Sequence, residues 1–130
     1  MKLTKMFRVS AAALGCLLAI ISCRQGEDAA SGPLAPVDVK IVNHLVAVLG
    51  HEGRVLELVD PASGEKVKSI RLAQPPNGMT VDGATAYVAE GGARGVVEVV
   101  DLESGELKRS FPAGHTPMAP VVRGEKLYVA

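Results

Sequence analysis

The sequence predicts an all-β fold in which one small antiparallel sheet is repeated along the chain. Residues 60–89 align with residues 101–130 without gaps at an offset of 41 residues, and 11 of the 30 aligned positions are identical. We expect the same offset throughout the repeat, which places Gly50 on Gly91. Each period contains short β-branched runs separated by turn residues. Beyond residue 23, no stretch has the 3.6-residue apolar period of a helix. A fixed period of this length indicates a repeat architecture.

The first element along the chain is an export signal. Lys2, Lys5 and Arg8 precede an uncharged run at residues 9–21, and polar residues follow immediately after Cys23. A helix needs about 20 apolar residues to span a bilayer, so this run is too short for a spanning helix. A basic start followed by a short apolar core is typical of a secretory signal peptide.

The end of the apolar run, Ile20-Ile21-Ser22-Cys23, resembles the bacterial lipobox. The resemblance implies cleavage before Cys23 and acylation of its thiol, so membrane lipid becomes a partner of the chain. We therefore expect a lipoprotein signal peptide at residues 1–22. The alternative is an ordinary signal peptide with a chance cysteine at this point. We also expect an exported protein, periplasmic or at the cell surface. Arg24 rather than Asp follows the cysteine, which resembles the outer-membrane sorting signal of enteric-type bacteria and implies the outer membrane in a Gram-negative host.

A tether is expected between the signal and the folded part. Residues 23–36 are rich in Gly, Ala, Pro and charged side chains and show no apolar periodicity. Such composition cannot bury enough apolar surface to fold and is typical of a disordered linker.

The remaining chain alternates predicted strands with predicted turns. Strands are expected at residues 45–49, 55–59, 66–72 and 96–100, and turns at residues 60–64, 76–78, 82–83, 91–95 and 101–105. Asp60 and Asp101 begin equivalent Asp-x-x-Ser-Gly turns, in which the carboxylate accepts backbone N–H bonds. Gly64 and Gly105 are expected to close these turns with positive φ.

Four short strands in about 40 residues is the period of a β-propeller blade. We expect four-stranded antiparallel blades in a partial propeller over residues 37–130, with repeats at about 37–76, 77–117 and a truncated 118–130. Propellers use about 4–8 blades, so these residues supply an incomplete ring of two to three blades. A longer protein is the favoured explanation, and closure by several chains is the alternative.

The repeat resembles the YVTN-type (YncE-like) β-propeller repeat. The resemblance is carried by Ala86-Tyr87-Val88-Ala89, residues 96–101, Ser104-Gly105, Gly114-His115-Thr116-Pro117 and Leu127-Tyr128-Val129-Ala130. It implies that Tyr87 and Tyr128 pack between blades, and that the loop of His115 and Thr116 faces the central channel as a possible ligand loop. The sequence departs from the family pattern at Pro120, which predicts a kinked or shortened innermost strand.

The residues offer little that points to other chemistry. His44, His51 and His115 lack the spacing of a metal site, so we expect no metal. There is no Cys-x-x-Cys-His, no catalytic constellation, and no helix after the Gly-rich residues 91–95, so we expect no cofactor in this segment. Glu57 and Glu98 occupy equivalent strand positions, which favours a solvated face over paired catalysis.

Charge and fold class together limit the predicted function. From Cys23 onward the chain carries 11 basic and 14 acidic side chains, which gives no electrostatic reason for nucleic-acid binding. We expect a lipid-anchored binding or scaffolding module at the bacterial cell envelope, with an unidentified protein or small molecule as its partner. The alternative is the N-terminal propeller of a longer haem-containing, cytochrome c or peroxidase-like electron-transfer enzyme. A quinone-dependent propeller is less favoured because the chain has no Trp. Whether the protein is an enzyme stays open, but the lack of a catalytic constellation in this segment favours a protein without enzymatic activity.

Overall fold

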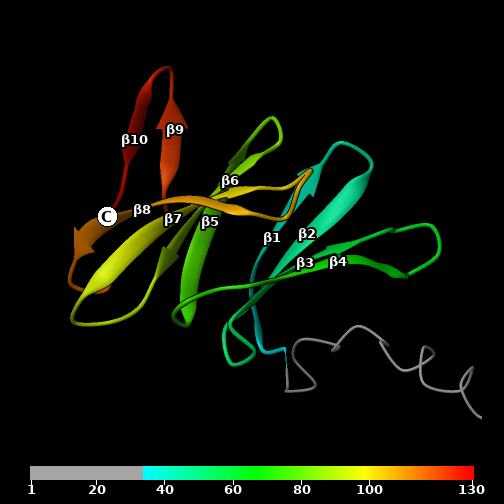
Figure 1. Ribbon diagram of the computed structural model, residues 1–130, viewed down its shortest axis with the longest axis horizontal. Helices are drawn as coiled ribbons and strands as arrows, with labels where there is room; N and C mark the ends of the chain where they lie inside the picture. The colour runs from blue at the N-terminus through cyan, green and yellow to red at the C-terminus, as the bar shows by residue number, and fades with distance from the viewer. Residues whose placement is uncertain (1–33) are drawn as a thin grey trace, which may run out of the picture.

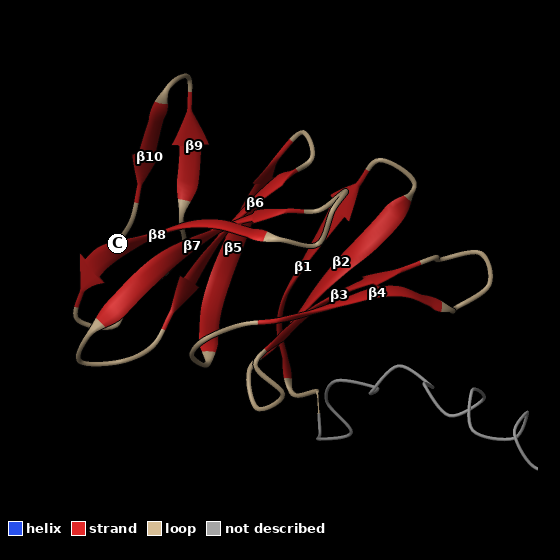
Figure 2. Cartoon of the chain, in the orientation of Figure 1, coloured by secondary structure: helices blue, strands red, loops and turns tan. Residues whose placement is uncertain are grey.

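The computed structural model describes residues 34–130 as three antiparallel sheets arranged side by side in a fan (Figure 1). All regular elements in this part of the chain are strands (Figure 2). The prediction of an all-β fold is therefore confirmed. The signal peptide, Cys23 and most of the tether lie outside the described residues.

Two sheets are complete four-stranded blades. Blade 1 has the order β1-β2-β3-β4, and blade 2 has the order β5-β6-β7-β8. The strands of blade 1 are β1 (Pro36–Val42), β2 (Leu45–Gly50), β3 (Val55–Val59) and β4 (Lys66–Arg71). Those of blade 2 are β5 (Pro76–Asp82), β6 (Thr85–Glu90), β7 (Gly95–Asp101) and β8 (Leu107–Gly114). Because each strand pairs with its neighbour in sequence, each blade is a simple meander.

The third sheet is the hairpin of β9 (Val121–Arg123) and β10 (Lys126–Tyr128). Strand β9 has 3 residues, whereas the equivalent β5 has 7. It begins directly after Pro120, which cannot donate a ladder hydrogen bond, and Ala119 has a φ of 43°. The predicted shortening of this strand is therefore confirmed.

The two blades superpose with a change of register that the sequence alignment missed. The β1–β2 turn at residues 43–44 corresponds to the β5–β6 turn at residues 83–84, an offset of 40. The outer strands keep the offset of 41, because Val55 pairs with Arg71 where Val96 pairs with Pro112. The expectation of a uniform offset of 41 was therefore wrong: one residue is inserted between β6 and β7, and Gly50 corresponds to Glu90 rather than to Gly91.

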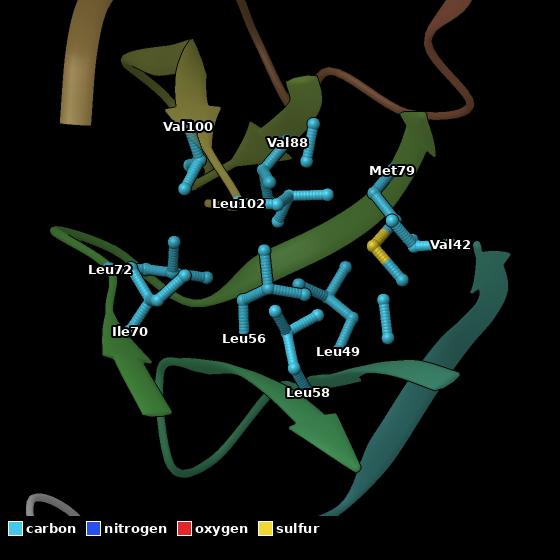
Figure 3. Close-up of a cluster of buried hydrophobic side chains, with 12 residues drawn as sticks. Val42, Leu49, Leu56, Leu58, Ile70, Leu72, Met79, Val88, Val100 and Leu102 are labelled. Atoms are coloured by element: carbon cyan, nitrogen blue, oxygen red, sulfur yellow. The ribbon is translucent and has the colours of Figure 1, made fainter. Parts of the chain in front are cut away.

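The core lies between the facing surfaces of the two blades (Figure 3). Blade 1 contributes large aliphatic side chains, and blade 2 opposes them mainly with smaller or more flexible ones. These residues are Leu49, Leu56, Leu58, Ile70 and Leu72 from blade 1 and the following linker, and Met79, Ala86, Val88, Val100 and Leu102 from blade 2. Close packing of these side chains removes apolar surface from water and fixes one blade against the other.

The opposite face of blade 1 is open. Val39 and Ile41 are 54% and 80% exposed. By the strand pairing they correspond to Met79 and Val81 of blade 2, which pack in the core against blade 1. Blade 1 therefore presents to solvent the kind of surface by which blade 2 docks on its neighbour.

The Asp-x-x-Ser-Gly turns form as the sequence predicts. Asp60 Oδ1 accepts the N–H of Ala62 at 2.8 Å, and Asp101 Oδ1 accepts the N–H of Ser104 at 3.0 Å. Gly64 and Gly105 have φ values of 75° and 82°. Both turns therefore need a residue that tolerates the left-handed region.

Two local predictions fare differently. Residues 76–78 were expected to form a turn, but they begin β5, because Asn77 Nδ2 donates to Gly91 O at 2.8 Å and to Pro117 O at 3.0 Å.

Tyr87 lies between blade 2 and the third hairpin, where it lines a pocket together with Val122, as expected. Tyr128 is 55% exposed, so its predicted packing between blades does not occur in the described part of the chain.

Candidate functional site

Five segments meet at one end of the blades and form what we call the loop end. It consists of residues 35, 51–54, 74–76, 91–94 and 115–117. The segments are joined by backbone hydrogen bonds: His51 N to Ala35 O at 3.0 Å, Gly91 N to Pro75 O at 2.8 Å, and Thr116 N to Gly92 O at 2.6 Å. Loops held on a rigid sheet scaffold in this way are where propellers and sandwiches carry their binding residues.

The predicted ligand loop lies at this end. His115 and Thr116 are both exposed, and Thr116 Oγ1 lies 3.0 Å from His115 Nδ1. Thr116 has a φ of 46°, so the backbone here adopts the left-handed region that non-glycine residues rarely occupy. The Thr116 N–H donates to Gly92 O, which ties this exposed loop to the β6–β7 loop.

The three histidines do not converge. His51 is half-buried in the loop end, where its Nδ1 donates to Pro76 O at 2.7 Å, which gives it a structural role. His44 lies in the β1–β2 turn, at the other end of the blade. Within residues 34–130, no group of three or more His, Cys, Asp or Glu side chains could hold a metal ion.

A pair of buried carboxyl groups lies beneath the loop end. Glu90 closes β6 and is fully buried, and Glu98 lies in β7 with 5% of its surface exposed. Gln74 N, in the linker between the blades, donates to Glu90 Oε2 at 2.9 Å. Burial, together with a hydrogen bond from Glu98, raises the pKa of Glu90 to about 8. At neutral pH, the pair therefore holds a proton between its two carboxyl groups.

The expectation that Glu57 and Glu98 lie on a solvated face was wrong. Both are buried: Glu98 lies on the face of blade 2 that packs against blade 1, and Glu57, on the opposite face of blade 1, is only 8% exposed. The two acids are neutralised differently. Glu57 Oε1 lies 2.7 Å from Lys66 Nζ, whereas Glu98 faces the second carboxyl of Glu90.

Glu90 is the residue that sequence reasoning missed. The alignment at an offset of 41 placed it opposite Leu49 and gave it no partner. The signal in the sequence was an acid that ends an otherwise uncharged strand run, at residues 85–90. Recognising its partner required the register across β6 and β7, where Val88 lies opposite Glu98 and Glu90 lies opposite Val96.

Two apolar grooves flank the sheets. One, of about 420 Å³, lies between the blades at the end opposite the loop end, and Val42, His44, Leu58 and Leu102 are among its lining residues. The other, of about 390 Å³, lies between the outer face of blade 2 and the third hairpin, lined by Val97, Phe111, Pro112, Ala113, Leu127 and Val129. Neither groove contains the carboxyl pair or the His115 loop.

The described residues include no helix long and apolar enough to cross a bilayer.

Comparison with known proteins supports the fold. No protein-family model matches the chain, and no curated protein matches it. Among solved structures, the chain is similar to a chain of Kuenenia stuttgartiensis hydrazine synthase, with a TM-score of 0.69 and 20% sequence identity. The match covers 82% of this chain and 32% of that one, so this chain spans about a third of the matched structure. At this identity the likeness concerns the fold, and with the strand order above it establishes that residues 34–130 are blades of an incomplete β-propeller.

Proposed function

We propose that the protein is an exported, lipid-anchored β-propeller that acts as a binding or scaffolding module at the bacterial cell envelope. The observation that supports a binding role is the loop end, where loops joined by backbone hydrogen bonds expose His115 and Thr116 to solvent. A rigid loop surface can bind with little loss of conformational entropy. The Gly114-His115-Thr116-Pro117 motif of the YVTN-type resemblance supports the same assignment.

The anchoring part of the proposal rests on the sequence. Residues 1–22 are assigned to a lipoprotein signal peptide, and residues 23–36 to a tether that holds the propeller away from the membrane. Two or three acyl chains on Cys23 would make the attachment effectively permanent, since each buried CH₂ contributes about 0.8 kcal/mol.

Metabolic labelling with radioactive palmitate tests the anchor. The wild-type chain and the Cys16→Ser control should incorporate label, whereas Cys23→Ser should incorporate none, because only Cys23 ends the lipobox. An unlabelled wild-type chain, or label that persists in Cys23→Ser, would refute the lipid anchor.

Site-specific photo-crosslinking in cell envelopes tests the binding role. A photoreactive residue at position 115 should yield a discrete adduct that the same residue at position 44, at the opposite end of blade 1, does not yield. Adducts of equal yield at both positions, or none at position 115, would contradict binding at the loop end.

A second candidate is the propeller of a longer haem-containing electron-transfer enzyme. The observation in its favour is the similarity to a chain named as a synthase, of which this chain spans 32%. Protein purified from its native host should then show the reduced-minus-oxidised absorption difference of a c-type haem in the same polypeptide. A haem-free polypeptide would exclude this candidate and leave the binding module.

A further inference from the structure

We propose that Glu90 and Glu98 form a proton-sharing latch whose deprotonation loosens blade 2 from blade 1, so that the packing of the two blades depends on pH. This inference concerns the blade interface and does not depend on the proposed function.

The strand register places the two carboxyl groups together. Val88 lies opposite Glu98 and Glu90 opposite Val96, so both acids point from the same sheet face, one step apart on neighbouring strands. That face also carries Val88 and Val100, which pack in the core against blade 1. The latch is therefore part of the blade interface rather than of the solvent-exposed surface.

The burial of the two acids and their unpartnered oxygen atoms indicate that the pair needs a proton. Glu90 is 0% and Glu98 5% exposed, and Glu90 Oε1 and Glu98 Oε2 are buried without a hydrogen-bond partner. These two oxygens can satisfy each other only if one carboxyl group is protonated and donates to the other. Removing that proton would leave two like charges in a site shielded from water, which is strongly unfavourable.

The charged groups on the surrounding elements do not neutralise the pair. Those on the facing strands and loops are Asp38 and Lys40 on β1, Lys68 on β4, His51, the exposed Glu52 and Arg54 between β2 and β3, and Arg94 between β6 and β7. Asp38 pairs with Lys40, Lys68 donates to the carbonyl groups of residues 102 and 103, and His51 is bonded to Pro76 O. Arg54 and Arg94 are exposed. In the described part of the chain, the latch therefore has no counter-ion.

The latch reaches the linker between the blades. Glu90 Oε2 accepts the N–H of Gln74, and Gln74 Nε2 donates to Arg94 O at 3.4 Å. Loss of the proton would therefore disturb the hydrogen bonds of the linker and of the β6–β7 loop. Both segments belong to the loop end.

The direction of the pH effect follows from the pKa of Glu90. The folded state raises this pKa from 4.5 to about 8, so between these values the folded chain holds a proton that the unfolded chain releases. Stability is therefore highest below about pH 4.5 with respect to this group. It falls as the pH rises toward about 8 and levels off above that.

Urea unfolding of the full chain between about pH 5 and about pH 9 tests the proposal. We compare wild type with Glu90→Gln, and use Glu57→Gln as the matched control, because Glu57 is a buried strand acid already neutralised by Lys66. The urea midpoint of wild type and of Glu57→Gln should fall as the pH rises, whereas that of Glu90→Gln should stay nearly constant. Parallel falls in all three proteins, or a flat wild-type profile, would overturn the latch.

Infrared difference spectroscopy gives a readout that does not depend on the stability of a variant. At neutral pH the folded wild-type chain should show the carbonyl stretch of a protonated carboxylic acid, which should vanish as the pH passes about 8. Glu98→Gln should shift the pH at which the band disappears, because a neutral amide replaces the carboxyl group that faces Glu90. A wild-type spectrum without this band at neutral pH would refute a shared proton.

Discussion

Asp101 and Gly105 set the sharp turn between β7 and β8. The Asp101 carboxylate accepts the N–H groups of Ser104 and Glu103, and these bonds hold the pKa of Asp101 below its usual value. Gly105 N in turn donates to Asp101 O at 2.8 Å, with φ at 82°. Blade 1 has the same arrangement at Asp60 and Gly64. The turn is therefore a structural feature of the repeat.

Replacing Gly105 by Ala should destabilise the chain by about 1–3 kcal/mol, because a Cβ is strained in the left-handed region. The added Cβ would also approach Lys68 Cδ to 3.1 Å. Gly92→Ala is the control, since Gly92 has open space around its Cβ position and lacks a positive φ. Urea unfolding measures both variants. Equal stability of Gly105→Ala and Gly92→Ala would contradict the turn geometry.

Residue-level prediction worked where local chemistry decides the conformation. The Asp-x-x-Ser-Gly pattern is sufficient to specify its own turn, so Gly64 and Gly105 could be assigned from the sequence. Glu98 could not, because its environment depends on which sheet face packs on the neighbouring blade. An isolated acid in a strand is usually solvated, and only the register that brings Glu90 beside Glu98 explains its burial.

At the scale of elements, the innermost strands are held by bonds that cross between blades and loops. Asn77, at the start of β5, bridges the carbonyl groups of Gly91 and Pro117 with a single side-chain amide. Met79 N donates to Asp38 Oδ2 at 2.9 Å, which ties β5 to β1. The order of the inner strands therefore rests on a few polar contacts as well as on the apolar core.

Asn77→Ala should cost about 1–3 kcal/mol, because two part-buried carbonyl groups lose their donor. The matched control is Gln74→Ala, whose amide makes one exposed bond of 3.4 Å to Arg94 O and should cost much less. Chemical denaturation gives the free energies of unfolding. If Asn77→Ala were as stable as wild type, the bridge would have no role in holding β5.

The strands at residues 45–49, 55–59 and 96–100 matched their predicted positions closely, because short continuous apolar runs rich in β-branched residues favour strands. The start of β5 did not, because Pro76-Asn77-Gly78 has the residue types of a turn. Contacts of Asn77 with Gly91 and Pro117, which are distant in the sequence, impose its extended conformation. The local sequence around residue 77 does not contain the information needed to predict these contacts.

At the scale of the whole molecule, the structure is one sheet used repeatedly and packed face to face. Leu56 and Ile70 of blade 1 meet Val88 and Val100 of blade 2 in the core, and the open face of blade 1 repeats the surface by which blade 2 docks. The sequence repeat predicted the repeated sheet. It could not predict the register of facing side chains, because a one-residue insertion between β6 and β7 leaves the outer strands aligned while shifting the inner ones.

Methyl-to-methyl nuclear Overhauser effects in isotope-labelled protein test the packing of these repeated sheets most directly. The two-blade arrangement predicts contacts within the cluster that joins Leu49, Leu56 and Ile70 to Met79 and Val88, together with cross-strand contacts inside each blade. Cross-strand contacts inside each blade without any contact between these two groups of methyls would contradict the face-to-face packing of the blades.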